Sequence, residues 1–270
     1  MSTKRKRIAV IADFHSGHLV GLTYPDFERR AQPNPGTKLH DCQRFRRAMW
    51  RYYSEKVEEL KPIELLIVNG DCIDGKGSRS GGTELLFSDR GEQASCAAAL
   101  INMWNAPMVL MSYGTPYHVG ADEDWEDEVF KEVQTKDKKI GGHDWVAVNG
   151  LTFSYRHFLG SSSVPYGRFT SLAKERTWEM EWAKRNEYPL GDVLLRSHVH
   201  YFKHAGDADW LGIITPALQG YGSKYGARKM SGTVDFGLVH FDVGEDGLND
   251  LEWHAHIRRF RWGKQDMTSL

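Results

Sequence analysis

Short apolar runs alternate with longer amphipathic segments through the first half of the chain. Arg7 to Asp13, Glu64 to Gly70 and Met108 to Tyr113 have the length and composition of buried strands. Asp41 to Leu60 and Glu92 to Trp104, which lie between these strands, have the pattern of helices. This order of strand, helix, strand, helix, strand predicts right-handed crossovers and a mainly parallel sheet.

The second half of the chain has a different pattern. Trp145 to Val148 and Leu151 to Tyr155 are joined by Asn149-Gly150, which favours a hairpin. Further elements are expected as helices over 122–133 and 171–186 and as strands over 192–197, 211–215, 236–243 and 251–257. Gly-rich turns separate the last three strands and suggest antiparallel pairing. We therefore expect one α/β domain over residues 1–270, with a second sheet against the first and long loops near 17–40 and 75–91.

Composition narrows the class of protein. The 270 residues include 40% apolar residues, with 35 Lys and Arg against 36 Asp and Glu, so a folded core is expected and strong nonspecific attraction to nucleic acid is not. No apolar run is long enough for a membrane span or a signal peptide. The three cysteines have no C-x-x-C spacing, which favours a reducing compartment and a soluble cytoplasmic protein. The 12 histidines stand out.

Acidic and imidazole side chains recur where predicted strands end. Asp13 and His15 end the first strand, and Asp71 and Asp74 follow Gly70 at the end of the second. The remaining members of this set are histidines at the ends of two later strands, namely His157, His198 and His200. An isolated histidine is more often a satisfied core or surface residue. Because carboxylates gathered at one sheet edge repel one another unless a cation lies between them, the whole set indicates two adjacent metal ions that share Asp71.

The order of these motifs resembles the calcineurin-like metallophosphoesterases, whose segments run D-x-H, G-D-x-x-D, G-N-H-D or G-N-H-E, a single His, and G-H-x-H. The corresponding segments here are Asp13-Phe14-His15, Gly70 to Asp74, a segment near Gly114, His157 and Ser197 to His200, over roughly residues 7 to 243. The resemblance implies two mixed β-sheets packed face to face between helical layers. It also implies two metal sites, one formed by Asp13, His15, Asp71 and His200 and the other by Asp71, His157 and His198.

Two segments depart from the family pattern. Ser197 replaces a glycine, and Gly114-Thr115-Pro116-Tyr117-His118 stands where the family has Gly-Asn-His. The hydroxyl of Thr115 can take the place of the family's Asn ligand, whereas His118 can serve as the catalytic imidazole or complete the second metal site itself. Similar G-T-x-x-H segments in phage-encoded relatives suggest a phage or prophage origin. A plain proline turn is the alternative interpretation.

The chemistry expected from this ligand set is hydrolysis of a phosphoester. Mixed imidazole and carboxylate ligands suit Mn, Fe, Zn or Ni, of which we expect Mn, better than Mg or Ca. A hydroxide that bridges the two metals would attack phosphorus. His118 would protonate the leaving oxygen or stabilise its charge, and Asp74 would orient a ligand.

Loop residues are the candidates for substrate contact. Lys76 and Arg79 follow the second motif, and Tyr221 and Lys224 lie in a Gly-rich segment. They can hold a phosphate or stack a base, although an exposed loop explains them equally well. The expected substrate is a phosphomonoester or phosphodiester of a nucleotide or nucleic acid. A binding or scaffold protein that keeps the fold with weak or no catalysis is the alternative, and the oligomeric state is left open.

Overall fold

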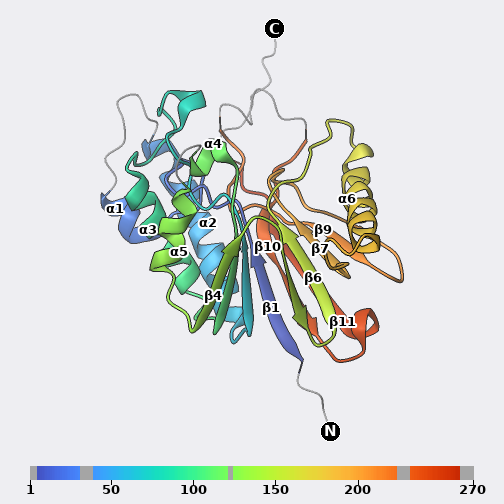
Figure 1. Cartoon of the computed structure of the whole chain (residues 1–270). Helices are drawn as coiled ribbons and strands as arrows, with labels where there is room; N and C mark the ends of the chain where they lie inside the picture. Colours follow the sequence, from blue (N-terminus) through green and yellow to red (C-terminus); the bar gives the residue numbers. More distant parts are fainter. Residues whose placement is uncertain (1–4, 31–38, 121–123, 224–231, 262–270) are drawn as a thin grey trace.

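Two mixed β-sheets form the centre of the molecule (Figure 1). The computed structural model describes residues 5–30, 39–120, 124–223 and 232–261. The six-stranded sheet has the order β11-β10-β1-β2-β3-β4, and the five-stranded sheet has the order β5-β6-β7-β9-β8. The strands of the first sheet are β1 (Lys6–Ile11), β2 (Leu65–Asn69), β3 (Met108–Ser112), β4 (Asp137–Gly141), β10 (Phe236–Val243) and β11 (Leu251–Arg258). Those of the second are β5 (Asp144–Val148), β6 (Leu151–Arg156), β7 (Val193–Arg196), β8 (Lys203–Gly206) and β9 (Leu211–Ile214).

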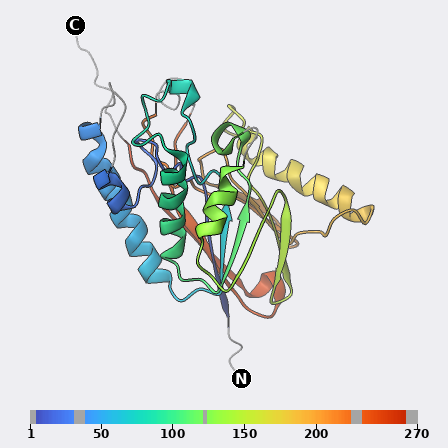
Figure 2. The ribbon, with the colours of Figure 1, turned by 60° about the vertical axis from the view of Figure 1, so that its left-hand side comes forward.

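Helices cover the outer faces of both sheets (Figure 2). The helices α2 (Leu39–Leu60), α3 (Arg90–Asn102) and α5 (Trp125–Glu132) lie against the six-stranded sheet, and α6 (Gly167–Lys184) lies against the five-stranded one. The shorter elements are α1 (Pro25–Arg30), α4 (Pro116–Val119), and the single 3₁₀ turns η1 (Ser78–Ser80) and η2 (Gly247–Asp250). This four-layer α/β/β/α arrangement confirms the predicted fold class.

The six-stranded sheet is apolar on both faces because each face is covered. Ile8 and Val10 of β1 point between the sheets, where they join a core that includes Phe153 of the second sheet. Ala9 and Ile11, on the opposite face of β1, pack in a second core together with residues of the helical layer such as Tyr53 of α2. Strands buried on both faces read as continuous apolar runs, which is why β1, β2 and β3 were visible in the sequence.

Strand pairing differs from the prediction at one place. β10 does not pair with β9: it returns to the first sheet and runs antiparallel to β1, with Lys6 opposite Val243, while β9 pairs with β7 and β8. Glycine-rich turns show where a chain reverses but not which strand it then meets. The antiparallel pairing of β10 with β11 and the Asn149-Gly150 hairpin between β5 and β6 are confirmed. The edge strands β4 and β8 were missed because their exposed, polar sequences lack an apolar run.

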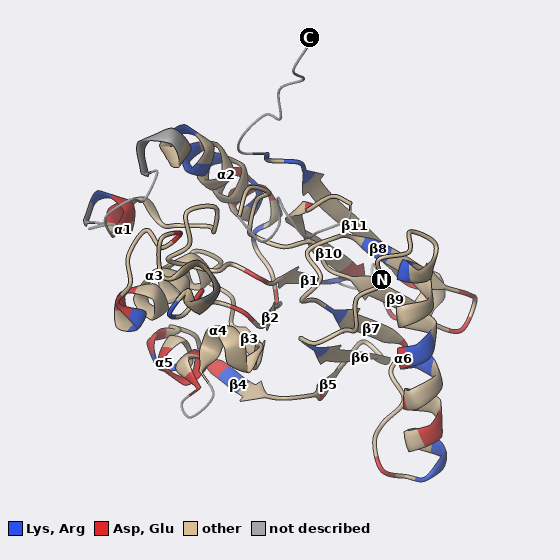
Figure 3. Cartoon of the chain, turned by 90° about the horizontal axis from the view of Figure 1, so that it is seen from above, with Lys and Arg blue, Asp and Glu red and all other residues tan. Residues whose placement is uncertain are grey.

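The carboxyl ends of β1, β2, β3, β6 and β7 meet at one end of the molecule, between the sheets. Figure 3 views this end from above and shows α2, α3 and α5 on one side of the sheets and α6 on the other. The loop after β1 runs beside the loop after β2, with Ser16 bridged to Ile73. Among the described residues, no helix is both long and apolar enough to cross a membrane.

Candidate metal centre

Asp13 and His15 lie in the loop that follows β1. Their backbone N–H groups donate to the carbonyl oxygens of Gly70 and Asp71 at 2.9 and 3.1 Å, so the loops after β1 and β2 are joined directly. β1 ends at Ile11, and both residues have a positive φ, 54° for Asp13 and 47° for His15. The two residues therefore lie beyond the strand that the sequence predicted to reach Asp13, and a left-handed loop brings them together.

Left-handed backbone marks most of this centre. Eight non-glycine residues of the described chain have a positive φ, and five of them are Asp13, His15, Asp71, His198 and His200. Each such conformation costs on the order of 1 to 3 kcal/mol and persists only where surrounding contacts enforce it. Strain of this kind concentrates at functional sites, and here it falls on the residues that the sequence motifs single out.

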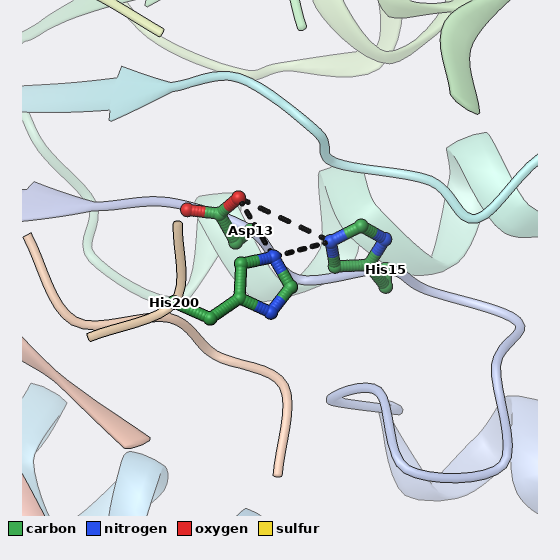
Figure 4. A group of neighbouring side chains, drawn as sticks. All are labelled: Asp13, His15 and His200. Atoms are coloured by element: carbon green, nitrogen blue, oxygen red, sulfur yellow. Dashed lines mark hydrogen bonds and ion pairs between the residues drawn. The ribbon is translucent and has the colours of Figure 1, made fainter. Parts of the chain in front are cut away.

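Asp13, His15 and His200 form the first group of candidate ligands (Figure 4). The Nε2 atom of His200 lies 3.2 Å from Oδ1 of Asp13 and 3.2 Å from Nε2 of His15. The Nε2 atom of His15 is 4.0 Å from the same Asp13 oxygen. One carboxylate oxygen and two imidazole nitrogens thus converge on one point.

Asp71, His157 and His198 form the second group. The Oδ2 atom of Asp71 lies 3.1 Å from Nε2 of His157 and 4.0 Å from Nδ1 of His198. Asp71 also forms a group with His15 and His118, so it lies between the first and second groups. This geometry allows the Asp71 carboxylate to serve two cations.

Several converging atoms lack a hydrogen-bond partner although they are buried. Among the described residues these include Oδ1 of Asp13, Nε2 of His157 and Nδ1 of His198. Burying polar atoms unpaired is costly, and a cation at each group would satisfy them. The mixture of carboxylate and imidazole donors fits a divalent transition metal at both positions.

Asp74 fixes two of the imidazoles. Its Oδ1 atom lies 3.3 Å from Nδ1 of His15, and its backbone carbonyl oxygen lies 3.0 Å from Nδ1 of His118. A carbonyl oxygen only accepts, so the Nδ1 atom of His118 carries a proton and its Nε2 atom is left for other chemistry. This is the orienting contact that ligand imidazoles usually receive.

The charges at the centre favour a bound cation. Burial opposes a charge on His157, but the carboxylate of Asp71 overcomes it and raises the pKa of His157 to about 10. Burial likewise opposes ionisation of Asp74, yet His18 and His15 lower the pKa of this carboxyl to about 2. At neutral pH the carboxylates are therefore ionised, and a proton on His157 occupies a position that a metal ion can take.

Thr115 contacts Asp71. Its backbone N–H donates to Oδ1 of Asp71 at 2.7 Å, and its hydroxyl lies 3.2 and 3.3 Å from the two carboxylate oxygens. The preceding Gly114 allows this approach, because a Cβ atom there would lie 2.2 Å from Oδ1 of Asp71. Thr115 therefore belongs to the centre through its contact with the carboxylate shared between the groups.

The sequence did not single out Glu126, which holds two of the loops of the centre. This fully buried side chain accepts hydrogen bonds from the backbone N–H of Cys72, at 3.0 Å, and of Gly114. Burial, with Asp71 nearby, raises the pKa of Glu126 to about 7. It lies in a run of acidic residues, where nothing in the sequence distinguishes an inward carboxylate from its exposed neighbours.

A cavity of about 400 Å³ opens over the metal centre and includes His15, Asp71, His118, His198 and His200 in its lining. Of the predicted substrate residues, Lys76 is exposed and does not line this cavity. Tyr221 also lies outside the lining, with its ring 4.7 Å from the guanidinium of Arg261. The side chain of Arg79 and the whole of Lys224 are outside the described residues.

The two-sheet fold agrees with the fold expected from the resemblance to calcineurin-like metallophosphoesterases. No family model matches the chain, and no curated protein matches it. Solved structures resemble it at low identity. An archaeal phosphodiesterase is 14% identical with a TM-score of 0.45, covering 93% of this chain and 99% of that one.

Two further solved structures show the same level of similarity. Vps29 from Entamoeba histolytica, complexed with zinc, is 11% identical with a TM-score of 0.41, covering 93% of this chain and 98% of that one. A predicted phosphoesterase from Streptococcus pneumoniae is 10% identical with a TM-score of 0.39, covering 94% of this chain and 100% of that one. None of these similarities is strong enough to assign an activity to this chain.

Proposed function

We propose that the chain is a dinuclear metal-dependent phosphoesterase that hydrolyses phosphomonoesters or phosphodiesters of nucleotides or nucleic acids. The observation that carries this proposal is the pair of carboxylate and imidazole groups that meet around Asp71 beneath an open cavity. A single structural metal site would not need a shared carboxylate, and a structural site would be closed rather than open to a cavity.

Each proposed metal ion has its own ligands. Asp13, His15 and His200 would hold one ion, His157 and His198 the other, and Asp71 would contribute to both. Two bound divalent ions supply Lewis acidity, which activates water and polarises phosphoryl oxygens. The ligand chemistry favours Mn, with Fe, Zn and Ni as the other candidates.

His118 is the proposed proton donor to the leaving oxygen. Its Nδ1 atom is held 3.0 Å from the carbonyl oxygen of Asp74 and 3.5 Å from Oδ1 of the same residue. These contacts orient the imidazole so that its Nε2 atom is the one left to face substrate in the cavity. Asp74 thus acts on the reaction through the two histidines that it orients.

Two exposed aromatic rings support a nucleotide as the substrate. Tyr117 packs edge-on against His118 with ring centroids 4.7 Å apart, and Phe158 lies over His198 with centroids 5.0 Å apart. Tyr117 is 36% exposed and Phe158 is 54% exposed, although large aromatic side chains are usually covered. Their positions beside the candidate ligands suit stacking on a nucleobase.

The contacts of Thr115 motivate the second candidate function, a binding protein with this fold and without hydrolysis. The N–H and hydroxyl of Thr115 both donate to Asp71, and threonine has no amide oxygen to replace the Asn ligand of the family pattern. Such a protein would bind metal and nucleotide but would leave phosphoesters intact.

The test is a phosphoester screen on protein reconstituted separately with Mn, Ni, Fe and Zn. The panel contains p-nitrophenyl phosphate, bis-p-nitrophenyl phosphate, nucleotides and a short DNA strand, and metal is counted by mass spectrometry. Turnover that disappears in Asp71→Asn and persists in the surface variant Glu128→Gln supports the proposal. Two bound metals without turnover of any substrate would overturn it and favour the binding protein.

A further inference from the structure

We propose that Arg168 forms a second anion subsite in the cavity, which binds a phosphoryl group of the substrate other than the one hydrolysed. This inference rests on the proposed phosphoesterase function and narrows its substrate class. Arg168 belongs to none of the sequence motifs.

Arg168 reaches the cavity from the side opposite the first metal motifs. It is the second residue of α6, which covers the outer face of the five-stranded sheet (Figure 1). It lines the same cavity as His198 and His200, whereas Asp71 and Asp74 enter that cavity from the six-stranded sheet. A substrate bound at the metal centre would therefore have Arg168 on the wall formed by the other half of the molecule.

The guanidinium of Arg168 is held in place. It lies 4.3 Å from the ring centroid of Tyr201, a buried residue that directly follows His200. On another side it meets Gly232, where an added Cβ would lie 2.4 Å from a guanidinium nitrogen. An arginine packed against a ring and a backbone segment loses less conformational freedom on binding an anion than an exposed one does.

Arg168 is also the only Lys or Arg among the described residues that line the cavity. The lining also includes the acidic residue Glu84 and the neutral polar residues Ser161, Ser162, Ser163, Gln219 and Ser223. Metal ions at the two ligand groups would take the oxygens of the phosphoester being cleaved. In the proposed subsite the guanidinium of Arg168 binds a different anionic group, and its planar geometry matches two phosphoryl oxygens.

The substrate class that follows carries at least two phosphoryl groups. The second group can belong to the same nucleotide, as in a nucleoside bisphosphate, or to the next nucleotide of a strand. Both sources present the same chemistry to Arg168. A substrate with one phosphoryl group and no other charge would bind without using it.

The experiment compares Arg168→Gln and Arg168→Lys with the wild-type protein in its metal-loaded form. Arg176→Gln is the matched control, since Arg176 lies on the same helix, donates to the carbonyl oxygen of Gly191 and does not line the cavity. The probes are thymidine bisphosphate, the dinucleotide pTpT, thymidine monophosphate and p-nitrophenyl phosphate. Steady-state kinetics gives kcat and KM separately, and calorimetry gives binding.

We expect Arg168→Gln to raise KM for one or both doubly phosphorylated probes by about 10- to 100-fold, with kcat little changed. The KM of Arg168→Gln for p-nitrophenyl phosphate should change by less than about 3-fold. For the doubly phosphorylated probes, the KM of Arg168→Lys should lie between those of the wild type and Arg168→Gln, because lysine keeps the charge but lacks the planar fork. An increase in KM confined to thymidine bisphosphate would place both phosphoryl groups in one nucleotide. An increase confined to pTpT would place the second phosphoryl group in the next nucleotide of a strand. An equal increase in KM for all of the probes, or no increase for any of them, would overturn the subsite.

Calorimetry separates this inference from the proposed function. Arg168-dependent binding of thymidine bisphosphate or pTpT without hydrolysis of any phosphoester would overturn the phosphoesterase and leave the subsite standing. If Arg168→Gln hydrolyses p-nitrophenyl phosphate normally and binds both doubly phosphorylated probes as tightly as the wild type, the subsite is overturned and the phosphoesterase stands.

Discussion

The Nδ1 atom of His157 lies 2.8 Å from the carbonyl oxygen of Asn69, and this contact joins the two sheets at the candidate metal centre. His157 follows β6 of the five-stranded sheet, and Asn69 is the last residue of β2 in the six-stranded sheet. The side chain of Asn69 donates back to the carbonyl oxygen of Arg156 and to the hydroxyl of Ser197. Because Nδ1 of His157 must donate to the carbonyl, its Nε2 atom is directed to Asp71.

Replacing His157 should therefore remove one metal ion. In His157→Gln we expect metal content to fall from two ions per chain to one, and kcat/KM to fall at least about 100-fold, because one ligand and its orienting bond are lost together. Mass spectrometry of the metals and hydrolysis of p-nitrophenyl phosphate measure both effects. His254→Gln, at an exposed position on β11, is the control. Retention of two ions by His157→Gln would show that His157 is not a ligand.

Two glycines with different surroundings test the approach of Thr115 to Asp71. Gly114→Ala should lower metal affinity and activity by roughly 10- to 100-fold, because its Cβ would lie 2.2 Å from Oδ1 of Asp71 and 2.5 Å from its backbone nitrogen. Gly142→Ala should have little effect, because its Cβ would meet nothing within 4 Å. Titration of each variant with Mn, followed by activity, is the measurement. Similar behaviour of the two variants would contradict this account of Gly114.

Glu126→Gln should destabilise the protein as well as the site. The substitution turns one of two accepting oxygens into a donor that faces a backbone N–H, which costs about 1 to 3 kcal/mol of unfolding free energy. Urea denaturation measures this cost. Glu128→Gln on the same helix removes only a surface ion pair with Lys131 and should cost less than about 1 kcal/mol. Equal costs in the two variants would rule out the role of Glu126 in holding the loops.

His240 should make stability depend on pH away from the metal centre. Burial, together with the imidazole of His256 at 2.8 Å, lowers the pKa of His240 to about 4 from an ordinary value of 6.5. Between these two pH values the unfolded chain binds more protons at this position than the folded chain, so stability rises with pH. The contribution of His240 is therefore present above about pH 6.5 and is lost progressively as the pH falls towards 4.

The comparison of wild type with His240→Gln isolates this effect, since the other titrating groups remain in both proteins. The charged and titratable groups around His240 are Arg7, Asp242, His254 and His256, and Lys56 and Glu59 of α2 both act on His256 through charge. The urea midpoints of the two proteins should converge as the pH falls from 6.5 to about 4, because glutamine at position 240 does not titrate. Parallel midpoint curves would contradict the prediction.

Metal removal should lower thermal stability. Chelation leaves the strained backbone of Asp13, Asp71 and His200 without the cations that would offset it. Adding Mn back at about 100 times its dissociation constant should restore about 2.7 kcal/mol per site, since binding to the folded state alone stabilises by mass action. A melting temperature that does not respond to Mn, Zn, Fe or Ni would show that the two groups hold no metal.

Most of the buried elements, and the residue types that carry the chemistry, can be predicted from the amino-acid sequence alone. The double burial of β1, β2 and β3 makes them continuous apolar runs, and polar residues that interrupt such runs at strand ends are conspicuous. Asp13, Asp71, His157 and His198 could therefore be selected before any contact was known. The edge strands β4 and β8, which bury little, left no comparable signal.

Which of these side chains meet depends on the packing of the whole chain. Asp13 and His200 are far apart in the chain, and their contact depends on loops with left-handed backbone that no local pattern specifies. Glu126 is one acid in an acidic run, and Arg168 is one arginine among many, until packing places the first beneath Gly114 and the second against Tyr201. Local sequence records burial and turn chemistry, whereas contacts between distant residues depend on how both sheets and their loops pack at once.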